Sequence, residues 1–248
     1  MKRFQKFSEI DGPDLINSTL KSIELNITTV CNRSCSFCPH SWGFKSEDIR
    51  QKFMSLETID RFIELIKDYK NNITLCGMGE PTLHPQIAEI LDKLQVLNNK
   101  ITLITNAYKL NEIKDHLGKI RPRISLYEPM ELPDIEYDLI DYTKEGENEY
   151  FNNRSYGDGL NKPCYFPSYK LVIDTNGGIL PCDNNWQNVL HLSNIHDNDL
   201  KIIWLEKLHP LRKNCLSNRL ENDYCKNCDS HGTLYGKTEA DLLTTNLP

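Results

Sequence analysis

The sequence predicts an α/β protein, because strand-like and helix-like segments alternate along most of its 248 residues. Short apolar β-rich segments recur between segments with apolar residues at helical spacing, and short loops join them. Such alternation produces a parallel sheet with right-handed crossovers. Roughly six strands are too few for a closed barrel of eight. We therefore expect a partial (β/α)6 TIM-like barrel, followed by a small C-terminal module made of a β-hairpin and a helix.

The first half of the chain supplies the expected elements that begin the barrel. Its strands are residues 22–30, 73–77 and 101–106. Its helices are residues 56–69 and 85–97. The first helix has an apolar stripe at helical spacing, and Pro85 stands near the first position of the second, where proline is tolerated.

The second half supplies shorter elements. A helix is expected over 111–120, with Asn111 as its N-cap. Strands are expected over 123–128, 137–143 and 169–175. An Asn-Gly-Gly turn inside 173–182 predicts a hairpin, and an amphipathic helix is expected over 198–213.

These elements divide the chain into four parts. Residues 1–22 form a polar N-terminal extension that we expect to pack loosely, and 23–160 form the barrel core. Residues 161–235 form the C-terminal module, which includes a last barrel strand near 169–175, and 236–248 form a tail.

Composition and charge narrow the functional classes. The formal net charge of −6 argues against a phosphate-gripping nucleic-acid protein. The basic start MKRFQKFSEIDG lacks the apolar segment of a signal peptide, and no apolar run has the length of a membrane span. We therefore expect a cytoplasmic protein with no membrane partner. In that reducing compartment, tightly spaced members of the nine cysteines are expected to be metal ligands.

Cys31, Cys35 and Cys38 form a C-x3-C-x2-C motif directly after the first strand. Three thiolates in such a short loop bind three irons of a [4Fe–4S] cluster and leave the fourth iron open to a small molecule. A zinc site is the alternative, with His40 as a fourth ligand.

This motif resembles the radical S-adenosylmethionine (radical SAM) superfamily. The resemblance implies that SAM binds the open iron and is cleaved to a 5′-deoxyadenosyl radical. The segments GMGEP and LITNA, which follow the second and third strands, match motifs that hold SAM in that superfamily. The residues that the resemblance assigns to SAM are Phe37, against the adenine, and Gly77, Gly79, Glu80, Thr105, Asn106 and Ser125.

The last third of the chain carries a second set of cysteines. Their order is a cysteine, a G-x4-C, an Ile-Trp helix and a C-x2-C, which resembles the SPASM domain in its shorter, single-cluster twitch form. The resemblance implies a second [4Fe–4S] cluster whose ligands are Cys164, Cys182, Cys225 and Cys228. A structural zinc ion bound by the same four thiolates is the alternative.

The whole arrangement resembles the small twitch-type radical SAM dehydrogenases. The resemblance implies an oxidoreductase that removes a hydrogen atom from a hydroxylated small molecule of the sugar or aminocyclitol type. A cluster with four protein ligands has no iron left for substrate, so it accepts the second electron and the net reaction is dehydrogenation. Arg154 is the candidate substrate-binding residue, and a solvated loop arginine is the alternative. A flavodoxin- or ferredoxin-type donor is expected to supply electrons.

Two cysteines and two other functions remain open. Cys76 lies in an apolar strand and is expected to be a core residue. Cys215 is a spare ligand, a core thiol or a hydrogen-atom donor, and in the last case the reaction becomes epimerisation. A peptide-modifying radical SAM enzyme is a second function, although the N-terminal extension of residues 1–22 is too short for a peptide-recognition domain. A non-enzymatic zinc protein leaves GMGEP and LITNA unexplained.

Overall fold

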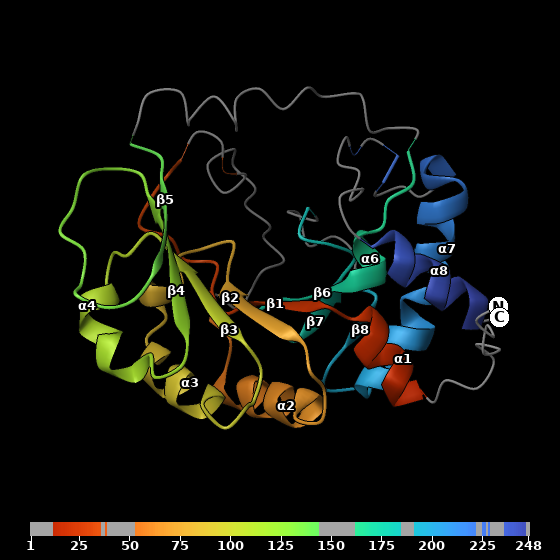
Figure 1. Ribbon diagram of the computed structural model, residues 1–248, viewed down its shortest axis with the longest axis horizontal. Helices are drawn as coiled ribbons and strands as arrows, with labels where there is room; N and C mark the ends of the chain where they lie inside the picture. Colours follow the sequence, from red (N-terminus) through yellow and green to blue (C-terminus); the bar gives the residue numbers. More distant parts are fainter. Residues whose placement is uncertain are drawn as a thin grey trace, which may run out of the picture.

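One eight-stranded sheet runs through the centre of the protein in the computed structural model (Figure 1). The strands lie in the order β5-β4-β3-β2-β1-β6-β7-β8. The first six of these pair in parallel, and β7 and β8 are added antiparallel. The strands are β1 (Ser22–Asn26), β2 (Asn72–Cys76), β3 (Ile101–Thr105), β4 (Arg121–Leu126), β5 (Asp138–Asp141), β6 (Lys170–Ile173), β7 (Gly178–Leu180) and β8 (Ser193–Asn194).

The predicted fold class is confirmed by this topology. Six parallel strands in an open sheet form the partial barrel, and a hairpin extends it on the side of β6. The structure describes residues 12–35, 38, 53–143, 162–184, 191–221, 225–226, 228 and 236–246. The candidate residues Phe37, His40 and Arg154 lie outside these ranges.

The helices and short turns complete the elements. The α-helices are α1 (Gly12–Thr19), α2 (Leu56–Ile66), α3 (Ile87–Leu94), α4 (Leu110–Ile113), α6 (Phe166–Tyr169), α7 (His209–Ser217) and α8 (Lys237–Asn246). The 3₁₀-helices are η3 (Pro81–Leu83), η4 (Lys114–His116) and η6 (Arg219–Glu221), and η5 (Ile202–Lys207) is a π-helix. In Figure 1, α2, α3 and α4 lie together along one side of the sheet. None of the described helices is long and apolar enough to cross a membrane.

Helix α2 shows how the sequence specifies these elements. The Ser55 hydroxyl accepts a hydrogen bond from the Thr58 N–H at 3.1 Å and so caps the first turn. The apolar stripe then buries Ile59, Phe62 and Ile66 completely. Burying a side chain of this size contributes about 1.5–3 kcal/mol, so the stripe fixes which side of the helix meets the sheet.

The two faces of the parallel sheet differ in polarity. Alternate strand residues such as Ile23, Leu25 and Leu75 are buried in the hydrophobic core with the helices. The register places Glu24 beside Thr74, and Asn26 beside Cys76, on the opposite face. We call this opposite side of β1–β4 the inner face. Parallel sheets are usually apolar on both faces, so a polar inner face indicates a surface that meets a ligand.

Several element boundaries differ from the sequence-based expectation. The first strand ends at Asn26 rather than residue 30, and Thr28 instead makes an isolated bridge with Phe53. The expected helix over 198–213 is divided at Leu208 into the π-helical η5 and α7. Pro210, which has no backbone N–H to donate, stands in the first turn of α7 and explains the break.

Residues 12–19 and 237–246 are helices rather than a loose extension and tail. Leu15, Ile16 and Leu243 from these helices belong to the core. The indole N–H of the fully buried Trp204 donates to the Thr19 hydroxyl at 2.9 Å. The buried ends therefore fasten the C-terminal module to the barrel.

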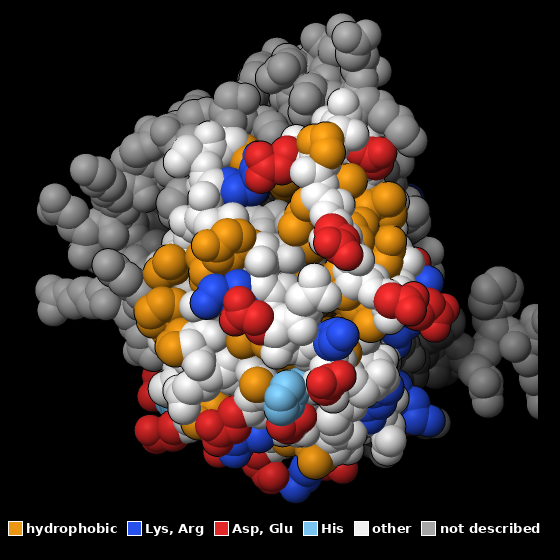
Figure 2. Space-filling model, turned by 90° about the vertical axis from the view of Figure 1, so that its left-hand side faces the viewer, with side chains coloured by type: hydrophobic (Ala, Val, Ile, Leu, Met, Phe, Trp, Pro, Cys, Tyr) orange, Lys and Arg blue, Asp and Glu red, His pale blue; other side chains and the backbone are white. Residues whose placement is uncertain are grey.

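The outer surface near β5 is mixed in character. Figure 2 views the protein from the side that carries α4 and β5, and its hydrophobic patches are interrupted by acidic and basic side chains. Met130, Leu139 and Ile140 are among the exposed hydrophobic residues. On this face, the described residues gather no patch of lysine and arginine that suits nucleic acid.

Candidate functional site

The cysteine loop leaves the sheet at the carboxyl end of β1, where α/β proteins place ligands. Cys31, Cys35 and Cys38 are half-buried, and the Cys38 N–H donates to the Cys35 carbonyl oxygen at 2.9 Å. Burial raises the pKa of the Cys31 thiol, and the charges of Glu80, Cys35 and Cys38 add to the increase. The three thiols therefore share one small region, as the motif predicts.

Gly77 and Gly79 bring the GMGEP segment against the chain just before Cys31. A Cβ atom on Gly79 would lie 2.2 Å from the Val30 carbonyl oxygen, and one on Gly77 would lie 2.5 Å from that of Thr28. The Gly79 N–H also donates to the Thr28 carbonyl oxygen at 3.1 Å. Both glycines are thus required by backbone packing that shapes the cysteine loop.

Glu80 is a buried residue whose hydrogen bonds connect the ends of β2 and β3. It is 3% exposed, and its carboxylate accepts hydrogen bonds from the Thr82 N–H at 3.0 Å and the Thr82 hydroxyl at 2.7 Å. It also accepts from the Thr105 hydroxyl at 2.5 Å and the Asn106 N–H at 2.7 Å. With four protein donors, Glu80 positions Thr105 and Asn106 rather than presenting a free carboxylate to a cofactor.

Replacing Glu80 with Gln is expected to lower the free energy of unfolding by about 1–3 kcal/mol, because an amide N–H₂ would face donors that now meet a carboxylate oxygen. Urea unfolding of E80Q against the wild type measures this loss. Glu131→Gln, which changes an exposed carboxylate, is the matched control. Equal stability of E80Q and E131Q would contradict the role of Glu80 in connecting β2 and β3.

Asn106 and Ser125 lie at the same edge as the cysteine loop. The Asn106 side-chain N–H donates to the Asn32 Oδ1 at 2.9 Å, which links the end of β3 to that loop. Ser125, which is 9% exposed, is hydrogen-bonded to Tyr127. Burial raises the pKa of Tyr127 to about 12, and this hydrogen bond opposes the increase. The structure therefore brings Gly77, Gly79, Glu80, Thr105, Asn106 and Ser125 to one edge of the sheet.

Arg33 is a residue of this edge that the motif analysis missed. Its Nη1 donates to Glu128 Oε1 at 2.7 Å, and its guanidinium lies 5.3 Å from the centre of the Tyr127 ring. Its side chain is also hydrogen-bonded to Cys35. Arg33 is the only charged residue between Cys31 and Cys38 in the sequence, which is a signal that would have identified it. It places a positive charge beside a thiol of the motif.

A half-buried charge cluster connects the inner face with the C-terminal module. Lys170 Nζ lies 2.7 Å from Glu24 Oε2 and 2.6 Å from Asp183 Oδ2. Burial alone would lower the pKa of Lys170, but the two carboxylates outweigh it and raise the pKa. Because Asp183 directly follows Cys182, this cluster ties the second cysteine set to the inner face. No sequence motif pointed to it.

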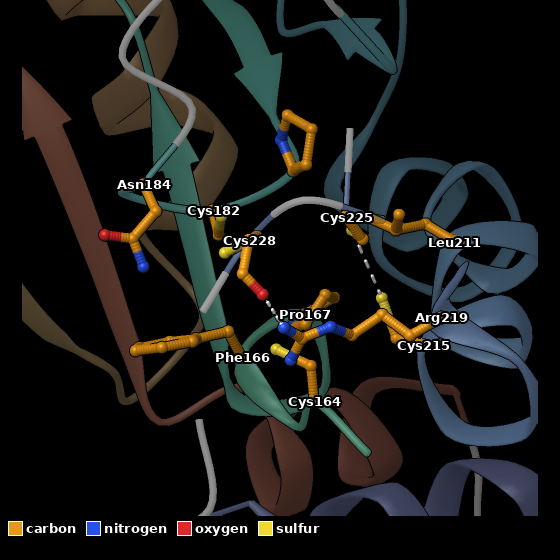
Figure 3. Close-up of a pocket in the computed structure, with 11 residues that line it drawn as sticks. Cys164, Phe166, Pro167, Cys182, Asn184, Leu211, Cys215, Arg219, Cys225 and Cys228 are labelled. Carbon is orange, nitrogen blue, oxygen red and sulfur yellow. Dashed lines mark hydrogen bonds between the residues drawn. The ribbon is translucent and has the colours of Figure 1, made fainter. Parts of the chain in front are cut away.

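The second set of cysteines surrounds one pocket (Figure 3). Its walls combine thiols with apolar side chains, including Phe166, Pro167 and Leu211. The five thiols are those of Cys164, Cys182, Cys215, Cys225 and Cys228. We call this the auxiliary pocket. The four cysteines expected as ligands are therefore brought together, and Cys215 joins them.

The thiols of the auxiliary pocket interact with one another. Cys215 Sγ and Cys225 Sγ lie 4.0 Å apart. Hydrogen bonding between the two thiols lowers the pKa of Cys225 against the effect of burial, and the positive charge of Arg219 assists. Arg219 is 5% exposed, and its Nη2 donates to the Cys228 carbonyl oxygen.

The pKa of the Cys182 thiol is also raised. Burial is the largest cause, the charge of Asp183 adds to the increase, and Cys164 and Cys228 contribute further. Among the residues that the structure describes, those lining the pocket include no histidine, and thiols are its main potential metal ligands.

The chemistry of this donor set fits an iron–sulfur cluster. Zinc draws all four sulfurs to about 2.3 Å from a single ion. Each ligand of a [4Fe–4S] cluster binds a different iron, so four thiols that line one pocket from several elements can hold such a cluster.

Cys76 lies on the inner face rather than among the core side chains of the helical face. It stands at the end of β2 beside Asn26, and its Sγ donates to Asn26 Oδ1 at 3.8 Å. Burial raises the pKa of this thiol well above its usual range. It does not line the auxiliary pocket.

Comparison with known proteins identifies the two halves of this site. The Radical SAM superfamily model matches residues 25–129, and SPASM, an iron–sulfur cluster-binding domain, matches residues 164–229. The chain therefore carries a Radical SAM domain and a SPASM domain, which imply that it uses SAM and iron–sulfur clusters. The Radical SAM domain indicates that the chain is an enzyme.

Individual relatives add detail. The chain is 22% identical to the S-adenosyl-L-methionine-dependent 2-deoxy-scyllo-inosamine dehydrogenase of Niallia circulans, over 84% of this chain and 92% of that enzyme. It is 32% identical to the GTP 3',8-cyclase of Actinobacillus pleuropneumoniae serotype 5b (strain L20), but over only 36% of this chain and 26% of that enzyme.

A solved structure supports the same fold. The crystal structure of BtrN in complex with AdoMet and 2-DOIA aligns with a TM-score of 0.69 and 19% identity. The alignment covers 88% of this chain and 96% of that one. At this identity the likeness establishes the fold, and the activity has to be argued from the residues of this chain.

Proposed function

We propose that this enzyme oxidises a secondary hydroxyl group of a small molecule, of the sugar or aminocyclitol type, to a carbonyl. The observation that carries the proposal is the auxiliary pocket, which provides enough thiols to saturate a second cluster. The similarity to an aminocyclitol dehydrogenase over almost its full length supports the same reaction.

The cofactors supply the radical chemistry when bound: SAM at a [4Fe–4S] cluster provides the 5′-deoxyadenosyl radical that takes a hydrogen atom, and the auxiliary [4Fe–4S] cluster takes one electron. The substrate carbon thus loses a hydrogen atom and an electron, and its hydroxyl loses a proton. The product is a ketone, two hydrogens lighter than the alcohol.

At the carboxyl edge of the sheet, Cys31, Cys35 and Cys38 would hold the first cluster. Gly77, Gly79, Thr105, Asn106, Ser125 and Phe37 would bind SAM, with Glu80 holding the ends of β2 and β3 in register. This assignment is supported by the bonds that join these segments to one another.

In the C-terminal module, Cys164, Cys182, Cys225 and Cys228 would hold the auxiliary cluster. Four thiolates leave no iron for substrate, so the residues here bind the cluster and tune its potential. Burial of Cys215, at 1% exposure, favours a role inside this pocket over hydrogen-atom donation to a substrate radical.

The substrate would lie against the inner face. Glu24, Asn26, Thr74 and Thr102 offer hydrogen-bonding groups there, which suit a polyhydroxylated molecule. Arg154 is proposed to reach the same substrate.

We also propose the division into an extension (1–22), a barrel core (23–160), an auxiliary module (161–235) and a tail (236–248), although the extension and tail contain packed helices. A flavodoxin- or ferredoxin-type protein would reduce the first cluster. A reducing compartment, the cytoplasm, would keep the nine cysteines available as ligands.

The test uses anaerobically reconstituted enzyme with SAM, a chemical reductant and a panel of inositols, aminocyclitols and sugars. We expect 5′-deoxyadenosine together with a product two mass units lighter. An alcohol deuterated at the reacting carbon should pass its label into 5′-deoxyadenosine.

Two results would contradict this function. Absence of 5′-deoxyadenosine under all conditions would exclude the radical chemistry. A product that has unchanged mass in H₂O and gains deuterium at carbon in D₂O would instead support epimerisation, and modification of a supplied peptide would support the peptide-modifying alternative.

A further inference from the structure

Cys215 is the fifth thiol of the auxiliary pocket, and a [4Fe–4S] cluster needs only four. It lies on α7, is 1% exposed, and has its Sγ 4.0 Å from Cys225 Sγ. Figure 3 shows Cys215 on the wall formed by the helix, with its sulfur directed at Cys225. The Cys164 N–H donates to the Cys215 carbonyl oxygen at 3.0 Å, which fixes α7 against the start of the module.

The position of Cys215 distinguishes it from the four expected ligands. Cys225 and Cys228 form a C-x2-C pair on a turn, whose two thiols suit neighbouring irons. Cys215 is instead held in a helix beside the apolar side chain of Leu211. A thiol that binds no iron keeps its S–H group, which is a weak donor, and a metal-bound thiolate is an acceptor.

We infer that Cys215 is a positioning residue whose S–H group donates a hydrogen bond to the Cys225 sulfur and raises the reduction potential of the auxiliary cluster. This inference rests on the proposed function, because it requires Cys225 to be a cluster ligand. Hydrogen bonds to cluster sulfurs favour the reduced state, which carries one more negative charge. Arg219, close to Cys225 and Cys228, adds a positive charge with the same effect.

The consequence is a cluster suited to accept an electron. A substrate radical gives up its electron more readily to a cluster of higher potential. Removal of the Cys215 donor should therefore lower the potential without removing the iron, which distinguishes this role from that of a ligand.

The experiment measures the midpoint potential of the auxiliary cluster by an EPR-monitored redox titration. The full chain carrying Cys31→Ala, Cys35→Ala and Cys38→Ala serves as background, so that only the auxiliary cluster contributes. In this background we compare C215A, C215V and C215S, with C76A as a control that removes a half-buried thiol outside the pocket.

We expect about four irons per chain in the background and in all four variants. C215A and C215V should show a lower midpoint potential than the background, C215S should recover part of the difference through its hydroxyl donor, and C76A should not change it. C215V fills the space that C215A leaves, so a folding defect in one variant leaves the other to decide.

Three outcomes would overturn the inference. Unchanged potentials in C215A and C215V with full iron content would show that Cys215 donates no hydrogen bond that affects the potential. The proposed function would still stand. Loss of iron in C215A, C215V and C215S would make Cys215 a ligand. Absence of iron in the background variant would show that the chain binds no auxiliary cluster. It would therefore contradict the proposed function as well.

Discussion

Replacing Cys31, Cys35 and Cys38 with alanine is expected to reduce 5′-deoxyadenosine formation to the level of a protein-free control. Without these thiolates no cluster offers an open iron to SAM, and the electron that cleaves the sulfonium has no entry. Liquid chromatography with mass spectrometry of anaerobic reactions measures the loss. The variant should still fold, because the three side chains are half-buried and lie outside the hydrophobic core.

Cys76→Ala is the matched control for this first prediction, since it removes a thiol that belongs to neither cysteine set. It should retain 5′-deoxyadenosine formation. Residual SAM cleavage by the triple variant at the wild-type rate would place the SAM-binding cluster elsewhere in the chain.

Replacing Cys225 and Cys228 with alanine is expected to separate SAM cleavage from product formation. The double variant should form 5′-deoxyadenosine but yield no ketone, because the substrate radical has lost its electron acceptor. Quantifying both products in the same reaction gives the ratio, which should fall from about one ketone per 5′-deoxyadenosine to near zero, if each turnover removes one hydrogen atom and one electron.

Folding of the double variant requires its own control, because the C-x2-C turn also helps to anchor the module through the bond from Arg219 to the Cys228 carbonyl. Circular dichroism and thermal unfolding against the wild type provide it. A folded double variant that makes ketone as efficiently as the wild type would exclude an auxiliary cluster from the reaction.

The sequence predicted the architecture well because the signals for it are local. The apolar stripe of Ile59, Phe62 and Ile66 and the strand alternation of Ile23 and Leu25 depend on neighbouring residues only. The C-x3-C-x2-C motif is local in the same sense. The second cysteine set is spread over residues 164–228, and its order along the chain predicted the gathering in one pocket.

The residues that escaped prediction depend on contacts distant in sequence. Glu24, Lys170 and Asp183 meet only because β1 pairs with β6 and β7 returns beside it. Likewise, the role of Glu80 in connecting β2 and β3 is visible only in the fold, where Thr105 and Asn106 of the next strand donate hydrogen bonds to it. A sequence pattern within one segment cannot predict contacts between residues that are far apart in the chain.

The ends of the chain escaped for a related reason. Residues 12–19 look polar in sequence, yet Leu15 and Ile16 are buried once Trp204 and α8 cover them. Cys215 was ambiguous because a single cysteine in a helix carries no spacing pattern, and only the pocket shows which thiol it faces.

The most direct test of two clusters in one chain is the iron and sulfide content of the anaerobically purified protein, with Mössbauer spectra, compared with the Cys31/Cys35/Cys38→Ala variant. We expect about eight irons per chain in the wild type and about four in the variant, with all iron in [4Fe–4S] signals. About four irons falling to none, with zinc retained in the variant, would contradict an internal electron acceptor and the proposed oxidation with it.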